Sequence, residues 1–250
     1  MRPKAILFDV DGTLAETEEL HRQAFNRTFQ EFGLDWDWDP ALYRDLLAVA
    51  GGKERLLHYI AAYDPPDAAR AEASLADLHA AKTRTYADLI TAGEARLRPG
   101  VARLMLEAHA AGIPVAIATT TSPENVEALL ATAGRDVAHT VAVIAAGDMV
   151  PNKKPAPDVY HYALERLGCA AADCVAIEDS AAGAEAALAA GLPTVITRSA
   201  FTEPGPAERV LCVLSDLGEP DAPFVRLAGG EEREGEGMVT LDLLRRWLAD

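Results

Sequence analysis

The sequence predicts an α/β protein with a Rossmann-like parallel sheet and an α-helical domain inserted after the first strand. From residue 95 onward, short apolar runs alternate with helical patterns, as in parallel sheets covered by helices on both faces. Between residues 15 and 95 only helical patterns occur. The first apolar run, Ala5-Ile6-Leu7-Phe8, leads directly into Asp9-Val10-Asp11-Gly12-Thr13, so a buried strand is expected to end at an acidic turn.

The inserted segment is predicted to contain three helical runs. The first spans Thr17 to Phe32, where Leu20, Ala24, Phe25, Phe29 and Phe32 recur at helical spacing before Gly33. The second spans residues 41–62 with a break near Gly51-Gly52, and the third spans residues 67–91 after Pro65-Pro66. We therefore divide the chain into a core, residues 1–15 and 95–250, and a helical cap domain, residues 16–94.

The rest of the core repeats a strand after each helix. The expected elements are, in chain order, a helix at 101–111, a strand at 115–118, a helix from Glu124, a strand at 141–144, a helix at 159–167, a strand at 175–177, a helix at 181–190, and strands at 194–196 and 210–214. Residues 218–237 are rich in Gly, Pro and Glu and are interpreted as a solvated loop. A short strand and a terminal helix are expected between Met238 and Leu248.

The composition narrows the possible partners. A formal net charge of −16 disfavours nucleic acid and anionic membranes, because both are bound through Lys and Arg. No run of about 20 apolar residues appears, and the N-terminal residues do not resemble a signal or transit peptide. The three cysteines lack metal-ligand spacing and are expected to be reduced. We expect a cytoplasmic monomer that binds a small phosphorylated molecule.

Polar residues gather where the predicted strands end. They are Asp9 and Asp11, the run Thr119 to Ser122, Lys154, and the pair Glu178-Asp179. The carboxyl ends of parallel strands meet at one edge of a sheet, so these segments are expected to share a crevice. Several carboxylates in one crevice must take up protons or bind a metal, and an all-oxygen ligand set favours Mg²⁺.

Each of these residues alone has an ordinary structural explanation. An Asp-Gly pair often makes a turn, a lysine is usually a surface residue, and Thr119 or Glu178-Asp179 could cap a helix. Together, however, a metal site, a lysine, a hydroxyl and a carboxylate nucleophile describe phosphoryl transfer through an aspartyl-phosphate.

The chain resembles the haloacid-dehalogenase-like hydrolases on four motifs. These are Asp9-Val10-Asp11-Gly12-Thr13, the strand ending in Thr119, Lys154-Pro155 and Glu178-Asp179-Ser180, in the order of that superfamily. The helical insert is similar to the mobile cap of the subgroup that includes β-phosphoglucomutase. Within it the chain looks most like the CbbY-type enzymes, phosphatases that remove the 1-phosphate of xylulose 1,5-bisphosphate, an inhibitory by-product of Rubisco.

The resemblance implies a role for each motif residue. Asp9 would be the nucleophile, and Asp11 the acid and base that protonates the departing oxygen and then activates water. Mg²⁺ would be held by the Asp9 carboxylate, the Asp11 main-chain carbonyl and Asp179, with Glu178 a direct ligand or one step away. Thr119 and Lys154 would hold the transferring phosphoryl group.

The cap is expected to recognise the rest of the substrate. Arg55 is the strongest candidate for a distal phosphate, since the related mutases use a cap arginine there. A solvated helix face would equally explain each basic cap residue alone, and His21 could simply be packed. The candidate substrate-binding residues are Glu18, His21, Tyr43, Gly52, Lys53, Arg55, Lys82 and Thr120.

Two other functions compete with a phosphatase. In a hexose-phosphate mutase the phosphoryl group returns to the substrate. The mutases carry Lys-Asn after the second motif and a small residue at the position of Glu18, whereas this chain has Ser122-Pro123 and Glu18. A non-catalytic phosphate-binding protein on the same fold is disfavoured because a binder has little use for Asp11. Glycolate-2-phosphate or other sugar phosphates remain alternative substrates.

Overall fold

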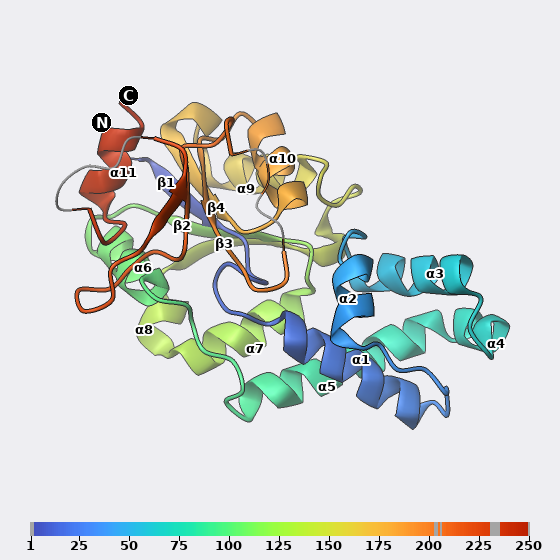
Figure 1. Ribbon diagram of the computed structural model, residues 1–250. Helices are drawn as coiled ribbons and strands as arrows, with labels where there is room; N and C mark the ends of the chain where they lie inside the picture. The colour runs from blue at the N-terminus through green and yellow to red at the C-terminus, as the bar shows by residue number, and fades with distance from the viewer. Residues whose placement is uncertain (1–2, 203–204, 206, 231–235, 250) are drawn as a thin grey trace.

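A mostly parallel sheet organises the larger part of the molecule (Figure 1). The computed structural model describes residues 3–202, 205, 207–230 and 236–249. Among these residues the sheet has seven strands in the order β3-β2-β1-β4-β5-β6-β7, and only β7 runs antiparallel to its neighbour. The strands are β1 (Ala5–Phe8), β2 (Val115–Thr119), β3 (Val141–Ala146), β4 (Cys174–Glu178), β5 (Thr194–Thr197), β6 (Cys212–Leu214) and β7 (Arg226–Ala228). The predicted fold class is therefore confirmed.

Strand β1 is central because it pairs with both β2 and β4. Ile6 lies opposite Val115 on one side and Val175 on the other. Successive side chains of a strand point to opposite faces, so Ile6 and Phe8 join one apolar cluster while Ala5 and Leu7 join another. Burial on both faces explains why the strand is apolar at every position.

Helices cover both faces of the sheet (Figure 1). The cluster containing Ile6 and Phe8 is completed by α6 (Val101–Ala110), α7 (Pro123–Ala133), α8 (Arg135–Ala138) and α11 (Leu241–Trp247). The opposite cluster is completed by α9 (Asp158–Leu167) and α10 (Ala181–Ala189). The 3-10 helices η1 (Gly147–Met149) and η2 (Ala171–Asp173) lie in connections. None of the described helices combines the length and apolar character needed to cross a membrane.

The inserted helices lie beside the sheet rather than on it, at the lower right of Figure 1. They are α1 (Glu18–Glu31), α2 (Pro40–Leu46), α3 (Gly52–Tyr63), α4 (Ala68–Ala73) and α5 (Leu75–Thr91). They share an aromatic core of their own, in which Phe25, Phe29, Trp36, Trp38 and Tyr43 are buried. Helices α1 and α5 also pack into the sheet cluster, through Leu20 and Leu89 among others. The division at residues 16–94 stays a prediction, and we keep the word cap for these residues.

The chain passes between the two parts at two adjacent points. Ala15 and Leu97 form an antiparallel bridge, and the amide of Arg98 donates to the carbonyl of Leu14 at 2.8 Å. The Arg98 guanidinium donates to main-chain carbonyls, including those of Gly12 and Ser215. The entry and exit of the cap are thus fastened to each other and to the sheet edge.

Several predicted element boundaries need correction. The strand expected at Met238 is wrong, because Val239 makes one main-chain hydrogen bond, to Leu217 at 2.8 Å, and joins no ladder. The loop expected at 218–237 instead contains β7, while residues 231–235 lie outside the described part of the chain. The run expected at 67–91 divides at Ser74 into α4 and α5. The strand expected at 210–214 begins only at Cys212.

Candidate active site

The candidate site lies where the central strands of the sheet end. Asp9 directly follows β1, Thr119 is the last residue of β2, and Glu178 is the last residue of β4. A cavity of about 950 Å³ opens between this edge and the cap. It is lined by most of the predicted site residues, namely Asp9, Asp11, Glu18, His21, Gly52, Lys53, Arg55, Lys82, Thr119, Thr120, Lys154 and Asp179, whereas Tyr43 and Glu178 lie outside its lining.

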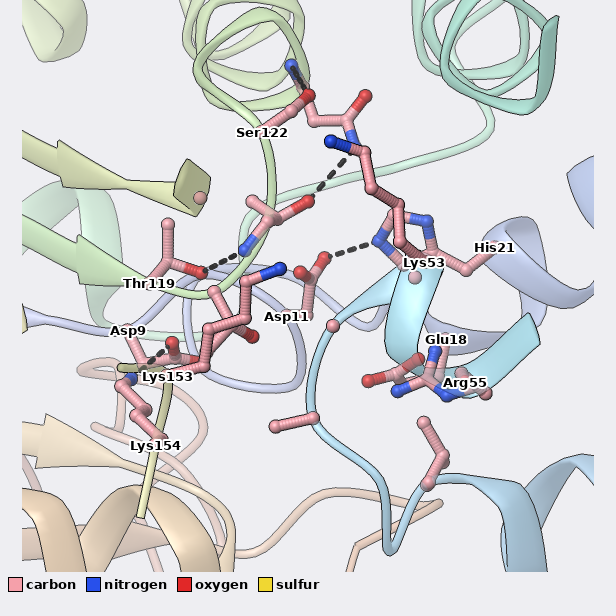
Figure 2. A pocket seen from close by; sticks show the side chains of 18 of the residues that line it. Asp9, Asp11, Glu18, His21, Lys53, Arg55, Thr119, Ser122, Lys153 and Lys154 are labelled. Atoms are coloured by element: carbon pink, nitrogen blue, oxygen red, sulfur yellow. Dashed lines mark hydrogen bonds and ion pairs between the residues drawn. The ribbon is translucent and has the colours of Figure 1, made fainter. Parts of the chain in front are cut away.

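Lys154 joins two carboxylates at the floor of the site. Its Nζ donates to Asp9 Oδ1 at 2.7 Å, to Glu178 Oε1 at 2.6 Å and to the carbonyl of Ala118 at 2.8 Å. Burial alone would lower the pKa of Lys154, but the two carboxylates raise it well above its usual range. The lysine is therefore charged, with its ammonium facing the Asp9 carboxylate (Figure 2).

The acidic side chains beside Lys154 have the composition of a cation site. Oxygen atoms of Asp9, Glu178 and Asp179 lie within 4.8 Å of one another, and all three residues are buried. Burial, together with the neighbouring carboxylates, raises the pKa of Asp9 to about 7 and that of Asp179 well above its usual range. One ammonium cannot balance three carboxylates, so the set fits a hard divalent cation bound through oxygen.

Asp11 lies in a separate hydrogen-bond chain that leads into the cap. The Thr17 hydroxyl donates to Asp11 Oδ1 at 2.5 Å. His21 Nε2 lies 2.9 Å from the same oxygen (Figure 2). Lys82 Nζ lies 2.6 Å from His21 Nδ1. Because the lysine donates to Nδ1, a neutral His21 carries its proton on Nε2 and donates it to Asp11.

The pKa values in this chain follow from burial and these contacts. Burial lowers the pKa of His21 to about 4, with the charge of Lys82 acting in the same direction. Burial also lowers the pKa of Lys82 to about 7. For Asp11, burial would raise the pKa, but His21 and the Thr17 hydroxyl outweigh it and lower the pKa to about 2. Asp11 is thus held ionised.

Three cap residues form a polar cluster that faces Asp11. The Tyr43 hydroxyl donates to Glu18 Oε2 at 3.1 Å, and the Arg55 guanidinium donates to the Tyr43 hydroxyl at 3.1 Å. Arg55 also donates to the carbonyls of Leu46 and Val49, each at 3.2 Å. Arg55, the predicted ligand of the distal phosphate, is 9% exposed and already bonded within the cap.

Lys53 and Gly52 lie at the start of α3, where the cap approaches the core. Lys53 Nζ is 2.7 Å from Asp148, which follows β3. Nearby, Lys153 of the core pairs with Glu54 of the cap at 2.7 Å and with Asp148 at 3.2 Å. A Cβ at Gly52 would lie 2.9 Å from His79 Nε2, so close packing accounts for this glycine. Four charged groups thus connect cap and core at the cavity rim.

The sequence did not single out several residues that contact the site. Thr17 is predicted only as the start of a helix, and Lys153 has no predicted role. Tyr160 donates its hydroxyl to Glu178 Oε1, and Thr202 donates to Asp179 Oδ2. The doubled lysine was a usable signal for Lys153, whereas a lone tyrosine in a helix and a lone threonine in a loop gave none.

Comparison with known proteins gives consistent matches. A family model described as a haloacid dehalogenase-like hydrolase matches residues 3–191. Protein CbbY of Cupriavidus necator is 50% identical over 247 residues, covering 98% of this chain and 96% of that protein. A CBBY-like protein of Arabidopsis thaliana is 40% identical, covering 87% of this chain and 70% of that protein.

Solved structures agree with these matches. CbbY from Rhodobacter sphaeroides in complex with phosphate has a TM-score of 0.79 and 46% identity, covering 86% of this chain and 94% of its own. The same protein carrying one Asp-to-Asn substitution was solved in complex with xylulose-(1,5)bisphosphate, with the same score and coverage. A β-phosphoglucomutase from Clostridium difficile, at 21% identity and a TM-score of 0.66, shares the fold.

Proposed function

This chain belongs to the haloacid dehalogenase-like hydrolase family, and we propose that within it the protein is a Mg²⁺-dependent phosphatase that removes the 1-phosphate of xylulose 1,5-bisphosphate. The coarser assignment, a phosphatase of sugar phosphates, rests on the full-length similarity to CbbY proteins. The finer one draws on the related protein that was solved with xylulose bisphosphate.

The observation that carries the proposal is the distribution of charge around the cavity. Lys154 lies at the floor beside Asp9, while Lys53, Arg55 and Lys82 lie on the cap side. In a protein with a net charge of −16, cations at both ends of one cavity suit a substrate with a phosphate at each end. A volume of about 950 Å³ is ample for a five-carbon bisphosphate.

Asp9 supplies the nucleophile of the proposed reaction. A carboxylate oxygen of Asp9 attacks the phosphorus, the P–O bond to the sugar breaks, and the phosphoryl group remains on Asp9. Lys154 and Thr119 bind the transferring group and offset its charge, which otherwise repels an anionic nucleophile. Attack by water on this phosphorus then releases inorganic phosphate and restores the Asp9 carboxylate.

Asp11 moves the protons. In the first step it donates a proton to the departing sugar oxygen, and in the second it accepts one from the attacking water. The hydrogen bonds from Thr17 and His21 favour the ionised form that the second step requires. The proton for the first step requires a higher pKa, and a bound phosphate dianion raises it by repelling the Asp11 carboxylate.

The residues that would hold Mg²⁺ are Asp9, Asp179 and the main-chain carbonyl of Asp11, with Glu178 direct or one step away. When bound, the ion would neutralise phosphate charge next to Asp9. The buried carboxylates fit this role because Lys154 alone leaves them with excess negative charge.

A phosphate-release assay tests the proposed substrate. Purified protein with Mg²⁺ is given xylulose 1,5-bisphosphate, and conversion of β-glucose 1-phosphate to glucose 6-phosphate is measured in parallel. We expect phosphate release from the first, lost by about 10⁴-fold or more in Asp9→Asn, because the nucleophile is removed. Conversion of the second alone would favour the mutase, and inactivity toward every sugar phosphate would favour the binding protein.

The cap side is tested with Arg55→Ala against Arg70→Ala. Arg70 is a cap arginine that donates to the carbonyls of Phe32 and Gly33, away from the cavity. We expect Arg55→Ala to reduce kcat/KM for the bisphosphate by about 10-fold or more and to affect a monophosphate much less. Equal losses on both substrates would place the second phosphate elsewhere.

A further inference from the structure

The loop Ser199–Thr202, which we call the β5 loop, lies between the acidic cluster and the cap. It follows β5, and both Phe201 and Thr202 line the cavity. No functional role is predicted for this segment from the sequence, and none of the proposed catalytic steps uses it. Its contacts nevertheless reach both halves of the site.

Thr202, the last residue of the loop, bonds to Asp179 of the candidate cation site. The Thr202 hydroxyl lies within hydrogen-bond distance of Asp179 Oδ2 and 3.3 Å from the Asp179 carbonyl. It is the one side-chain donor to this carboxylate within the described part of the chain. On the other side, a Cβ at Gly12 would clash with Asp179 Oδ2. The carboxylate is therefore held between Thr202 and the turn that follows Asp11.

Phe201, the residue before Thr202, packs against an aromatic ring and a guanidinium group of the cap. The Phe201 ring meets the Tyr43 ring edge-on, with centroids 6.4 Å apart and planes at 76°. The Arg44 guanidinium lies over the same ring at 5.7 Å. The hydroxyl of Tyr43 also joins Glu18 to Arg55. Phe201 thus contacts the cap beside its polar cluster.

The start of the loop is fixed to the crossing between cap and core. Glu16 Oε2 accepts from the Ser199 hydroxyl at 3.1 Å and from the Ala200 amide at 3.4 Å. Glu16 in turn pairs with Arg98 at 3.4 Å. The loop is therefore held by hydrogen bonds at Ser199 and Ala200 as well as at Thr202.

We propose that the β5 loop couples the position of the cap to the affinity of the metal site, with Thr202 as a positioning residue for Asp179 and Phe201 as its contact with the cap. Groups that hydrogen-bond to metal ligands fix the orientation of those ligands, and their loss weakens metal binding by about 10- to 100-fold. The inference rests on the proposed Mg²⁺ site but not on which sugar is cleaved.

Calorimetric titration of Mg²⁺ into the full chain, without substrate, tests the Thr202 part. We expect Thr202→Val to weaken Mg²⁺ binding by about 10-fold, because it removes the hydroxyl and keeps the shape. Thr202→Ser keeps the hydroxyl and should bind as the wild type does. Thr132→Val, at an exposed threonine of α7, is the matched control. If Thr202→Val does not fold, Thr202→Ala removes the same hydroxyl.

The link to the cap is tested by Phe201→Ala beside Phe201→Tyr. We expect the alanine variant to bind Mg²⁺ about threefold to tenfold more weakly and the tyrosine variant to behave as the wild type. Wild-type affinity in Thr202→Val overturns the positioning role, and wild-type affinity in Phe201→Ala overturns the coupling. Either result leaves the phosphatase proposal intact. Absence of Mg²⁺ binding by the wild type would instead overturn the proposed metal site itself.

Discussion

At the scale of single residues, Lys154 supplies the buried positive charge at the floor of the site. It is 6% exposed and is the cation paired with both Asp9 and Glu178. Charges taken out of water are tolerated only with partners, so removing this ammonium leaves carboxylates that neither water nor another cation of the described residues offsets.

Lys154→Met is therefore expected to destabilise the protein as well as to inactivate it. Breaking a buried ion pair typically costs about 3–5 kcal/mol, which urea unfolding without Mg²⁺ can measure. Lys53→Met is the matched control, since the Lys53–Asp148 pair has side chains 40% and 64% exposed. Exposed pairs contribute about 0–1 kcal/mol. Equal losses in the two variants would contradict the importance of burial.

Glu18 gives a prediction about pH. Burial raises its pKa to about 7, with Asp11 adding to the effect and Arg55 opposing it. An unfolded glutamic acid has a pKa of about 4.3, so between these values the folded protein binds more protons than the unfolded chain. Stability contributed by protonated Glu18 is therefore complete below the unfolded pKa and is lost as pH rises through 7.

We expect Glu18→Gln to become more stable relative to the wild type as the pH increases from 5 to 8, by at most roughly 3 kcal/mol. Urea unfolding at both pH values measures this difference. Glu19→Gln, at a neighbouring residue whose pKa is lowered by Arg22, should not show such a gain. A constant difference across the range would mean that Glu18 is ionised throughout.

The motif residues could be predicted from the sequence because each ends a recognisable strand. Asp9, Thr119 and Glu178 follow or end apolar runs, and topology alone brings them together. Residues such as Thr202 and Tyr160 could not be predicted, since their partners lie 23 and 18 positions away with no pattern between them. Arg55 was placed at the cavity, but its bonds to Tyr43 and main-chain carbonyls depend on helix packing that one sequence does not specify.

At the scale of elements, ion pairs join α3 of the cap to the segment after β3 at the cavity rim. Asp148 accepts from Lys53 of the cap and pairs with Lys153 of the core. These groups are partly exposed, so their attraction depends on salt. Because these pairs join the cap to the core, any separation of the two would break them.

Asp148→Asn is expected to raise KM about twofold to fivefold at low ionic strength, because the closed arrangement loses one charge partner. At about 1 M salt the wild type and the variant should converge. Steady-state kinetics at both salt concentrations measure this. Asp158→Asn, a change in the same connection away from the cap, is the control; an unaltered KM for Asp148→Asn at low salt would contradict the role of the rim.

Element boundaries were predictable where hydrophobic pattern and caps agree. Ser122 and Pro123 begin α7 as a cap and first residue should. Strand β7 (Arg226–Ala228) escaped prediction because it is short and lacks an alternating apolar pattern: Leu227 is 44% exposed, whereas the Arg226 side chain is buried. The strand expected at Met238 is absent because Val239 is buried in the core cluster without pairing to a neighbouring strand.

At the scale of the whole molecule, Mg²⁺ bound at the acidic cluster would stabilise the folded protein. A ligand that binds only the folded state stabilises it by about 2.7 kcal/mol at 100 times its Kd. For a chain of 250 residues this corresponds to a Tm increase of roughly 5–10 °C. We expect this increase when Mg²⁺ is added to chelator-treated protein, followed by calorimetry.

The same increase should be absent in Asp179→Asn, which removes one carboxylate of the cluster. The variant Asp173→Asn, at an exposed carboxylate that pairs with Lys4, should respond as the wild type does. A wild-type Tm that is indifferent to Mg²⁺ would indicate that the cluster binds no ion at these concentrations.

The bridge between Ala15 and Leu97 has a consequence for how such proteins diversify. Since the segment between them leaves and re-enters the sheet at neighbouring points, a different insert whose ends lie equally close together could be joined there with little strain. Transplanting residues 16–96 from a relative should therefore exchange the recognised sugar while leaving Asp9, Lys154 and Asp179 in place. We expect the recognised sugar to change with the inserted segment, while the reactive residues stay at the strand ends.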